Sequence, residues 1–195
     1  MAWARASDGV RLHYEATGRR DAPPVLMIQG LGADKHLWDL QRIPLSFGYR
    51  VIALDNRGAG RSDKPFGHYS LDQMADDAIA VLDAEGIDRV HVVGASMGGA
   101  ISQIVAVNHP HRVRSLTLAC TACRNHAWRR ELLEGWATLA TERGVAATTT
   151  ARGPARLTSL RRRASWFGTT SCTDCRDSMS AFTRPGTKTW ISAPE

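Results

Sequence analysis

Short hydrophobic runs alternate with helically periodic segments along the first 145 residues. The runs at 25–28, 49–54, 90–93 and 113–118 are mostly apolar and too short for helices, so each predicts a strand, and the first two predict buried strands. Helical spacing of apolar residues predicts helices from 71 to a stop at Gly86 and at 128–143, and we expect two further helices, at 35–45 and 98–108. This alternation predicts an α/β fold, with a mainly parallel sheet and helices on both faces.

Local turn and capping signals fix two details of this pattern. Residues 2–5 and 10–14 flank Asp8-Gly9, a pair that accepts the positive φ of a tight turn, so they predict a β-hairpin that starts the sheet. Ser70, with Gln73 three residues later, predicts an N-cap for the helix that opens at Leu71.

The pattern is lost after residue 145. Residues 146–195 contain ten Thr, six Ser and seven Arg, but only six residues of the types Leu, Ile, Val, Met and Phe. That is too few for a packed core, so we expect a core at 1–145 and a poorly ordered, basic tail at 146–195. The abrupt change suggests the hypothesis that the tail is out of frame or degenerate, which the other two frames of the coding DNA would test.

Charge is distributed unevenly between these two parts. The formal net charge is +6, but residues 1–145 hold 17 Lys and Arg against 16 Asp and Glu, whereas the tail holds 8 against 3. The core therefore gives no electrostatic reason to expect nucleic acid as a partner. No apolar stretch approaches the length of a membrane span, and residues 1–5 do not resemble a secretory signal. We therefore expect a cytoplasmic protein, and the sequence does not specify its oligomeric state.

The four cysteines form two C-x-x-C pairs, Cys120 with Cys123 and Cys172 with Cys175. Such pairs invite a zinc site as one alternative. The first pair directly follows an apolar run and the second lies in the unpatterned tail, so chance is the favoured interpretation. We expect no bound metal and no organic cofactor.

Residues 94–98 carry the strongest chemical signal in the chain. Gly94-Ala95-Ser96-Met97-Gly98 has the form G-x-S-x-G, and it lies between a predicted strand and a predicted helix of small residues. In this context the serine occupies a sharp turn that exposes its hydroxyl, and the helix behind it directs its positive end toward the site. The alternative, an ordinary glycine-rich turn, is less consistent with the flanking elements.

Two further motifs precede this one in a fixed order. Gln29-Gly30-Leu31-Gly32 follows the strand at 25–28, and residues 55–62 read Asp-Asn-Arg-Gly-Ala-Gly-Arg-Ser after the strand at 49–54. Together the three motifs resemble the α/β-hydrolase family over about residues 8–145. The resemblance implies Ser96 as nucleophile and the backbone N–H groups of Leu31 and Met97 as donors to an oxyanion.

The resemblance also implies structural roles in the three loops. Gly30, Gly32, Gly94 and Gly98 are motif positions, and Asp55 and Arg57 are expected to fix their loop and not to act in catalysis. Gln29 departs from the pattern, because many family members carry histidine there; its amide is still able to orient the loop.

A second departure concerns the partners of the serine. The family order is serine, acid and then histidine, the last two on loops after later strands. His91 lies within a strand, His109 and His111 bracket a proline turn, and His126 lies at the entrance to the helix at 128–143. We expect none of them to reach Ser96, so the chain as written is expected to lack its acid and base, as a truncated or frame-shifted sequence would, and to have very low activity.

The leading functional hypothesis is hydrolysis of small carboxylic esters, of the carboxylesterase or lipase-like type. Lactonase and cofactor-free haloperoxidase-like activities use the same serine site and stay open, whereas a dehalogenase would carry aspartate in place of Ser96. A non-catalytic remnant or binding protein on the same fold is the alternative from another class. Trp128 and Trp136 are candidates for an acyl pocket, but packing within their own helix is favoured.

Overall fold

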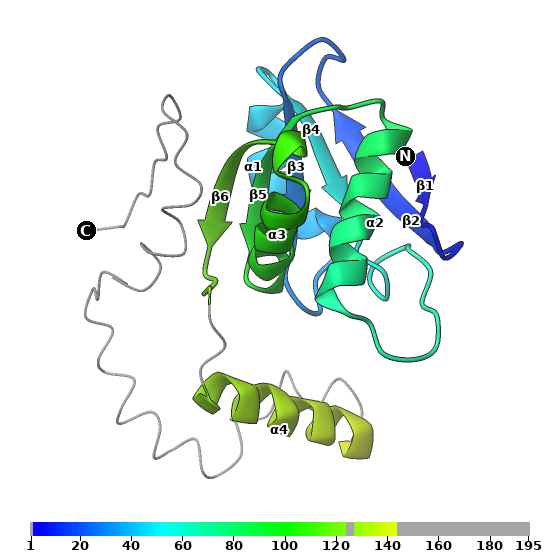
Figure 1. Ribbon diagram of the computed structural model, residues 1–195, viewed down its shortest axis with the longest axis vertical. Helices are drawn as coiled ribbons and strands as arrows, with labels where there is room; N and C mark the ends of the chain where they lie inside the picture. The colour runs from blue at the N-terminus through cyan, green and yellow to red at the C-terminus, as the bar shows by residue number, and fades with distance from the viewer. Residues whose placement is uncertain (1, 124–126, 144–195) are drawn as a thin grey trace, which may run out of the picture. The chain divides into compact units, whose positions relative to one another are not determined.

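The computed structural model describes residues 2–123 and 127–143 (Figure 1). In the described residues a six-stranded sheet has the order β1-β2-β4-β3-β5-β6. Its strands are β1 (Ala2–Arg5), β2 (Arg11–Thr17), β3 (Pro24–Ile28), β4 (Arg50–Leu54), β5 (Val90–Ala95) and β6 (Val113–Ala119). At one edge the two pairings β1–β2 and β2–β4 are antiparallel, whereas β4, β3, β5 and β6 pair in parallel. The predicted strands and the mainly parallel arrangement are confirmed.

The hairpin at the sheet edge forms as its sequence predicts. Ala2 pairs with Tyr14 and Arg5 with Arg11, which leaves the intervening residues for the turn. Gly9 has φ +88°, the conformation that the Asp-Gly pair was expected to supply.

Helices cover both faces of the sheet, as predicted. The helical segments within residues 2–123 are η1 (Lys35–Trp38), α1 (Asp39–Leu45), α2 (Leu71–Ala84), α3 (Met97–Asn108) and η2 (Pro110–Arg112). The helices α2 and α3 pack together on one face, whereas η1 and α1 lie on the other (Figure 1). The larger core lies under α2 and α3, and the smaller one packs Trp38 against Met27 and Ala53.

Two helix starts show how the sequence sets local structure. Ser70 Oγ accepts the Gln73 N–H and the Gln73 side chain accepts the Ser70 N–H, so the predicted cap of α2 is a complete capping box. The expected single helix at 35–45 is instead a 3₁₀ turn followed by an α-helix. The reason is that Asp34 and Asp55 accept the backbone N–H groups of His36 and Lys35, which fixes a tight first turn.

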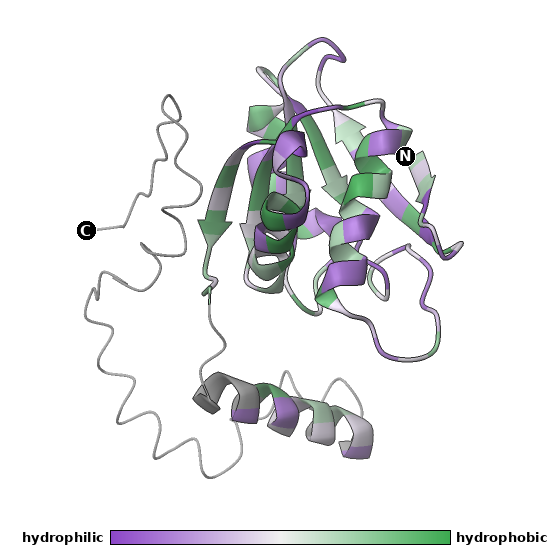
Figure 2. Cartoon of the chain, in the orientation of Figure 1, coloured by the Kyte–Doolittle hydropathy of each residue, from purple (hydrophilic) through white to green (hydrophobic). Residues whose placement is uncertain are grey.

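The strands that lie between the helix layers are the most hydrophobic part of this unit. Figure 2 shows β3, β4 and β5 largely in the colour of hydrophobic residues. Every residue of β4 is buried, including Arg50, because strands of a parallel sheet are covered on both faces. These strands therefore form the rigid base from which the chemically important loops emerge.

The segment at 127–143 is helix α4 (Ala127–Arg143), as its periodicity predicts, and it belongs to a separate compact unit. In it, Leu133 and Trp136 are partly exposed. His126, the tail at 146–195 and the side chain of Trp128 lie outside the described residues. None of the helices in the described part of the chain is both long and apolar enough to cross a membrane.

Candidate active site

Ser96 occupies the junction between β5 and α3. Its backbone has φ 53° and ψ −117°, a region that non-glycine residues rarely adopt, and its side chain is exposed. The Ser96 N–H donates to the carbonyl of Ala119 at 2.9 Å, and the Ser96 carbonyl accepts the Gly99 N–H at 3.0 Å. Hydrogen bonds on both sides of the residue therefore hold it in the strained turn, with its hydroxyl outside the helix.

Glycines allow the start of α3 to approach the sheet closely. A Cβ on Gly98 would lie 2.1 Å from the carbonyl oxygen of Ile28, and a Cβ on Gly94 would lie 2.3 Å from Ser102 Oγ. Real Cβ atoms do not come so near to a backbone oxygen, so any side chain at position 98 would push α3 away from β3. The two motif glycines thus set the distance between the turn and the neighbouring strand.

The loop after β3 lies beside Ser96. In the parallel ladder Ile28 is paired with Gly94, so both strands end at the same edge of the sheet. A Cβ on Gly30 would lie 3.1 Å from Ser96 Cβ and 3.6 Å from Ser96 Oγ. Leu31 follows Gly30 and is exposed, and Met97 follows Ser96 as the first residue of α3. The structure therefore brings these motif residues together from positions more than sixty apart in the sequence.

Asp55, at the end of β4, connects three segments of the unit. Its carboxylate accepts the Lys35 N–H at 2.8 Å and the Arg61 N–H at 3.1 Å, and it lies 2.8 Å from Nδ1 of His13 on β2. Burial alone would raise its pKa, but these backbone and side-chain donors, with the charge of Lys35, hold the pKa of Asp55 below its usual value. Asp55 is fully buried, so its contacts are internal to the protein.

Arg57 connects the same loop to α2 and to the hairpin turn. Its Nε and Nη2 donate to the two carboxylate oxygens of Asp77 at 2.6 and 2.7 Å, and its Nη1 donates to Asp8 at 2.8 Å. These hydrogen bonds raise the pKa of Arg57 despite its burial, whereas burial raises the pKa of Asp77 against the opposing effect of Arg57. The bidentate pair fixes the orientation of both side chains.

The Gln29 side chain makes no hydrogen bond to the described residues, although it is fully buried. Asn56 instead supports the loop, since its Nδ2 donates to the Gln29 carbonyl at 3.3 Å. The expectation that the Gln29 amide orients its own loop therefore has no contact to support it.

None of the described histidines donates a hydrogen bond to the Ser96 hydroxyl or accepts one from it. His91 Nδ1 lies 2.7 Å from Ser115 Oγ on the neighbouring strand, His109 lies 3.5 Å from Asp76, and His36 pairs with Asp39. His13 is buried against Asp55 on the far side of β4. The described residues thus supply no base to Ser96.

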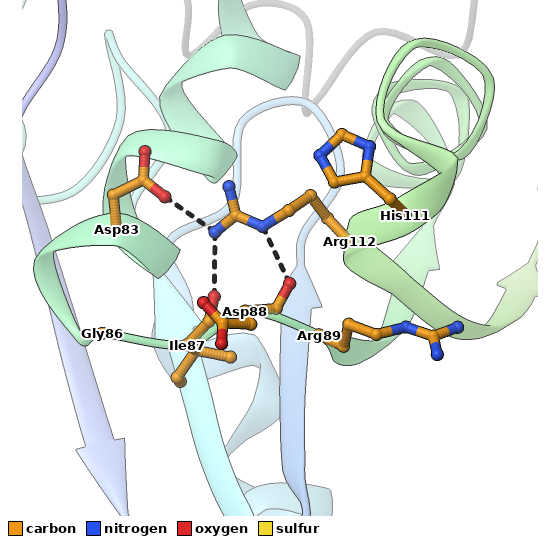
Figure 3. A pocket seen from close by; sticks show the side chains of 7 residues that line it. All are labelled: Asp83, Gly86, Ile87, Asp88, Arg89, His111 and Arg112. Carbon is orange, nitrogen blue, oxygen red and sulfur yellow. Dashed lines mark hydrogen bonds and ion pairs between the residues drawn. The ribbon is translucent and has the colours of Figure 1, made fainter.

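A hollow of about 420 Å³ lies at the opposite end of the strands, where β5 begins. Figure 3 shows that the Arg112 guanidinium fills its centre, donating to Asp83 Oδ1 and to the carbonyls of Ile87 and Asp88. His111 and Arg89 lie at its sides. Through Nε and Nη2, Arg112 joins η2 to the end of α2 and to the segment before β5, and no motif residue lines this hollow.

The sequence analysis assigned no contact with these loops to four residues: His13 and Lys35 beside Asp55, and Asp77 and the turn residue Asp8 beside Arg57. Asp77 carries one usable signal, because it lies among apolar residues on the inner face of the helix predicted from Leu71. The others come from distant strands and turns, and no local pattern marks them.

Comparisons with known proteins identify the family to which this fold belongs. A family model described as the alpha/beta hydrolase fold matches residues 23–174. A putative carbamate hydrolase, RutD, from Azorhizobium caulinodans is 36% identical over 134 residues, covering 69% of this chain and 49% of that protein. 3-Oxoadipate enol-lactonase 2 from Acinetobacter baylyi is 36% identical over 115 residues, covering 59% of this chain and 43% of that protein.

Solved structures show the same likeness. The enol-lactonase from Burkholderia xenovorans LB400 has a TM-score of 0.70 and 28% identity, covering 93% of this chain and 64% of that one. A thermophilic esterase from Thermogutta terrifontis has a TM-score of 0.67 and 28% identity, covering 73% of this chain and 54% of that one. The chain spans about half the length, or less, of the curated relatives that it matches. By its family model, its relatives and its fold, the chain belongs to the alpha/beta hydrolase family of enzymes.

Proposed function

We propose that this protein is a serine hydrolase of carboxylic ester bonds in which Ser96 is the nucleophile. The observation that carries the proposal is the backbone of Ser96, which holds a positive φ of 53° between β5 and α3 with its side chain exposed. A strained residue at a functional turn is maintained because the surrounding structure enforces it, here through the bonds to Ala119 and Gly99.

Two backbone amides complete the proposed site. The N–H groups of Leu31 and Met97 each follow a residue of the close pair formed by Gly30 and Ser96. An oxyanion that forms on a substrate beside Ser96 Oγ would accept from both, and each such donor is typically worth about 3 kcal/mol of barrier. The start of α3 adds the positive end of the helix dipole.

The chemistry of this site requires a base that the described residues do not supply. A serine hydroxyl is a weak nucleophile without one, and in a known triad the loss of a member leaves only about 10³- to 10⁴-fold catalysis over water. We therefore propose that the chain binds and orients ester substrates but turns them over very slowly. A non-catalytic protein on the same fold is the alternative.

Lactones are the second candidate substrate, and the names of the relatives favour them. Enol-lactonases occur both among the relatives at 36% identity and among the structures with a TM-score of 0.70. A lactone is a cyclic ester, so the same nucleophile and amides would serve. Parallel assays of an acyclic ester and a small lactone distinguish the two.

Active-site labelling tests the nucleophile. Because Ser96 lacks a base among the described residues, a fluorophosphonate probe is expected to label the full chain at Ser96 slowly, and not to label Ser96→Ala. Ser115→Ala is the matched control, because Ser115 is exposed like Ser96 and lies beside His91, but it is in the middle of a strand. Labelling that survives Ser96→Ala would refute Ser96 as the labelled nucleophile, and a wild type that is not labelled even after long incubation would favour the non-catalytic alternative.

Turnover tests the missing base. With p-nitrophenyl acetate we expect slow hydrolysis by the full chain, little changed in Ser96→Ala. Brisk hydrolysis that Ser96→Ala abolishes would show that Ser96 has a base after all, and the proposal of an impaired site would be wrong.

A further inference from the structure

The segment from η1 to α1 buries Trp38 and two basic side chains against the sheet and leaves several other apolar side chains exposed. Lys35 is buried, its Nζ 3.4 Å from Glu15 Oε1, and Arg42 Nη1 donates to Glu15 Oε2 at 2.8 Å. Asp39 accepts from Arg42 Nη2 at 2.7 Å. These ion pairs direct Lys35 and Arg42 toward β2, so they do not separate the exposed apolar side chains from one another.

The exposed side of this segment carries apolar side chains that we together call the α1 face. It comprises Leu37, Leu40, Ile43, Pro44 and Phe47. Within α1, at 3.6 residues per turn, Leu40, Ile43 and Pro44 fall within about 100° of the helix circumference. The exposed fractions of Leu37, Leu40, Ile43 and Phe47 are 58%, 85%, 56% and 88%. Four large apolar side chains are therefore exposed on η1, on α1 and just after α1.

We propose that the α1 face is an interface at which two copies of this chain pack through α1 around a two-fold axis. Its exposed apolar area is on the order of 500 Å², at the upper range of patches on monomers. Two such faces together bury about 1,000 Å², which is the lower range for a specific interface between proteins. The area thus fits a weak, concentration-dependent dimer.

The charges around the α1 face favour a second copy over other occupants. Between residues 36 and 49, all described, Asp39 pairs with Arg42 and lies 2.9 Å from His36 Nδ1, so the charged and titratable side chains of this segment are paired among themselves. A strongly charged partner would find no counter-charge there. A membrane surface would require lysines or arginines beside the apolar residues, and this segment has none exposed. A neutral apolar helix face is, by contrast, complementary to itself.

Sedimentation velocity of the full chain tests this interface. Between about 1 and 100 µM we expect a shift from monomer to dimer, consistent with a Kd on the order of 10 µM. Leu40→Glu is expected to remain a monomer throughout. Phe66→Glu is the matched control: Phe66 is fully exposed on the loop before α2, away from the α1 face, and this variant is expected to dimerise like the wild type. Leu40 is itself mostly exposed, so its replacement leaves the core intact.

Charge pairing across the axis provides a sharper test. Leu40→Glu and Leu40→Lys are each expected to be monomeric, and their equimolar mixture is expected to recover a dimer, because position 40 would face its own copy. A wild type that stays monomeric at 100 µM would overturn the proposal. It would mean that another protein or another part of the chain covers the α1 face. A dimer that persists in Leu40→Glu, is lost in Phe66→Glu, or fails to return in the mixture would also overturn it.

Discussion

Gly30 and Ser96 approach so closely that a methyl group on the glycine would lie 3.1 Å from the serine Cβ. The contact joins the loop after β3 to the turn after β5, and it leaves the serine little freedom on that side. The same short distance makes Gly30 a sensitive probe of the proposed site.

Gly30→Ala is expected to slow fluorophosphonate labelling of Ser96 about tenfold. The added methyl group displaces the serine or the loop by a few tenths of an ångström, and small misplacements at a reacting centre reduce rates steeply. Gly48→Ala is the matched control, because a Cβ there meets nothing within 4 Å. Unchanged labelling of Gly30→Ala, or equal slowing in the control, would contradict the close placement.

Gly98→Ala is expected to destabilise the protein by about 3 kcal/mol or more, although alanine is the better helix former by about 1 kcal/mol. The reason is the carbonyl of Ile28, which would lie 2.1 Å from the new Cβ. Urea denaturation measures the difference. A variant as stable as the wild type would show that α3 does not pack against β3 in this way.

Arg57→Ala is expected to destabilise the fold by about 3 to 5 kcal/mol, because it leaves the buried Asp77 carboxylate without its bidentate partner. Arg57→Lys keeps the charge but not the planar fork, so it should lose part of this stability. Thermal melting of both variants tests whether Arg57→Ala loses more stability than Arg57→Lys. Arg112→Ala, which breaks an ion pair to the exposed Asp83, is the comparison and should lose less.

Asp55→Asn is expected to show a pH-dependent loss of stability. The pKa of Asp55 is lowered in the folded protein from 3.8, so its carboxylate stabilises the fold above that pH, and this contribution is lost as the pH falls through the folded pKa. The stability difference from wild type, about 2 kcal/mol at pH 7, should therefore shrink below about pH 4. Denaturation curves at several pH values measure it.

Asp88→Asn serves as the control for that series, because Asp88 is exposed and its substitution removes the same formal negative charge. A difference for Asp55→Asn that is constant from pH 7 to pH 3 would mean that the carboxylate charge is not the stabilising feature.

Local signals in the sequence were sufficient to predict most of the strands and helices and the mainly parallel sheet. The apolar runs at 90–93 and 113–118 became β5 and β6, extended by one or two residues, and Ser70 with Gln73 formed the expected cap. Each of these depends on neighbours within a few residues, so the sequence reports them directly. The G-x-S-x-G motif identified the turn for the same reason, because the strand and helix that enclose it are adjacent in the chain.

The partners of Asp55 and Arg57 were decided by the tertiary structure. His13, Lys35 and Asp8 come from separate strands and turns, and only the strand order β2-β4-β3 brings them to these side chains. The 3₁₀ turn at η1 depends on the same contact, since Asp55 accepts the Lys35 N–H.

The orientation of α1 shows the difference between what the sequence determines and what the tertiary structure decides. The sequence predicted a short helix at residues 35–45. It could not establish which residues face the sheet, because that choice depends partly on Glu15, twenty residues earlier than Lys35 on β2, which pairs with Lys35 and Arg42. The sequence therefore determined that this segment is helical, and long-range ion pairs together with the packing of Trp38 determined which of its side chains are buried.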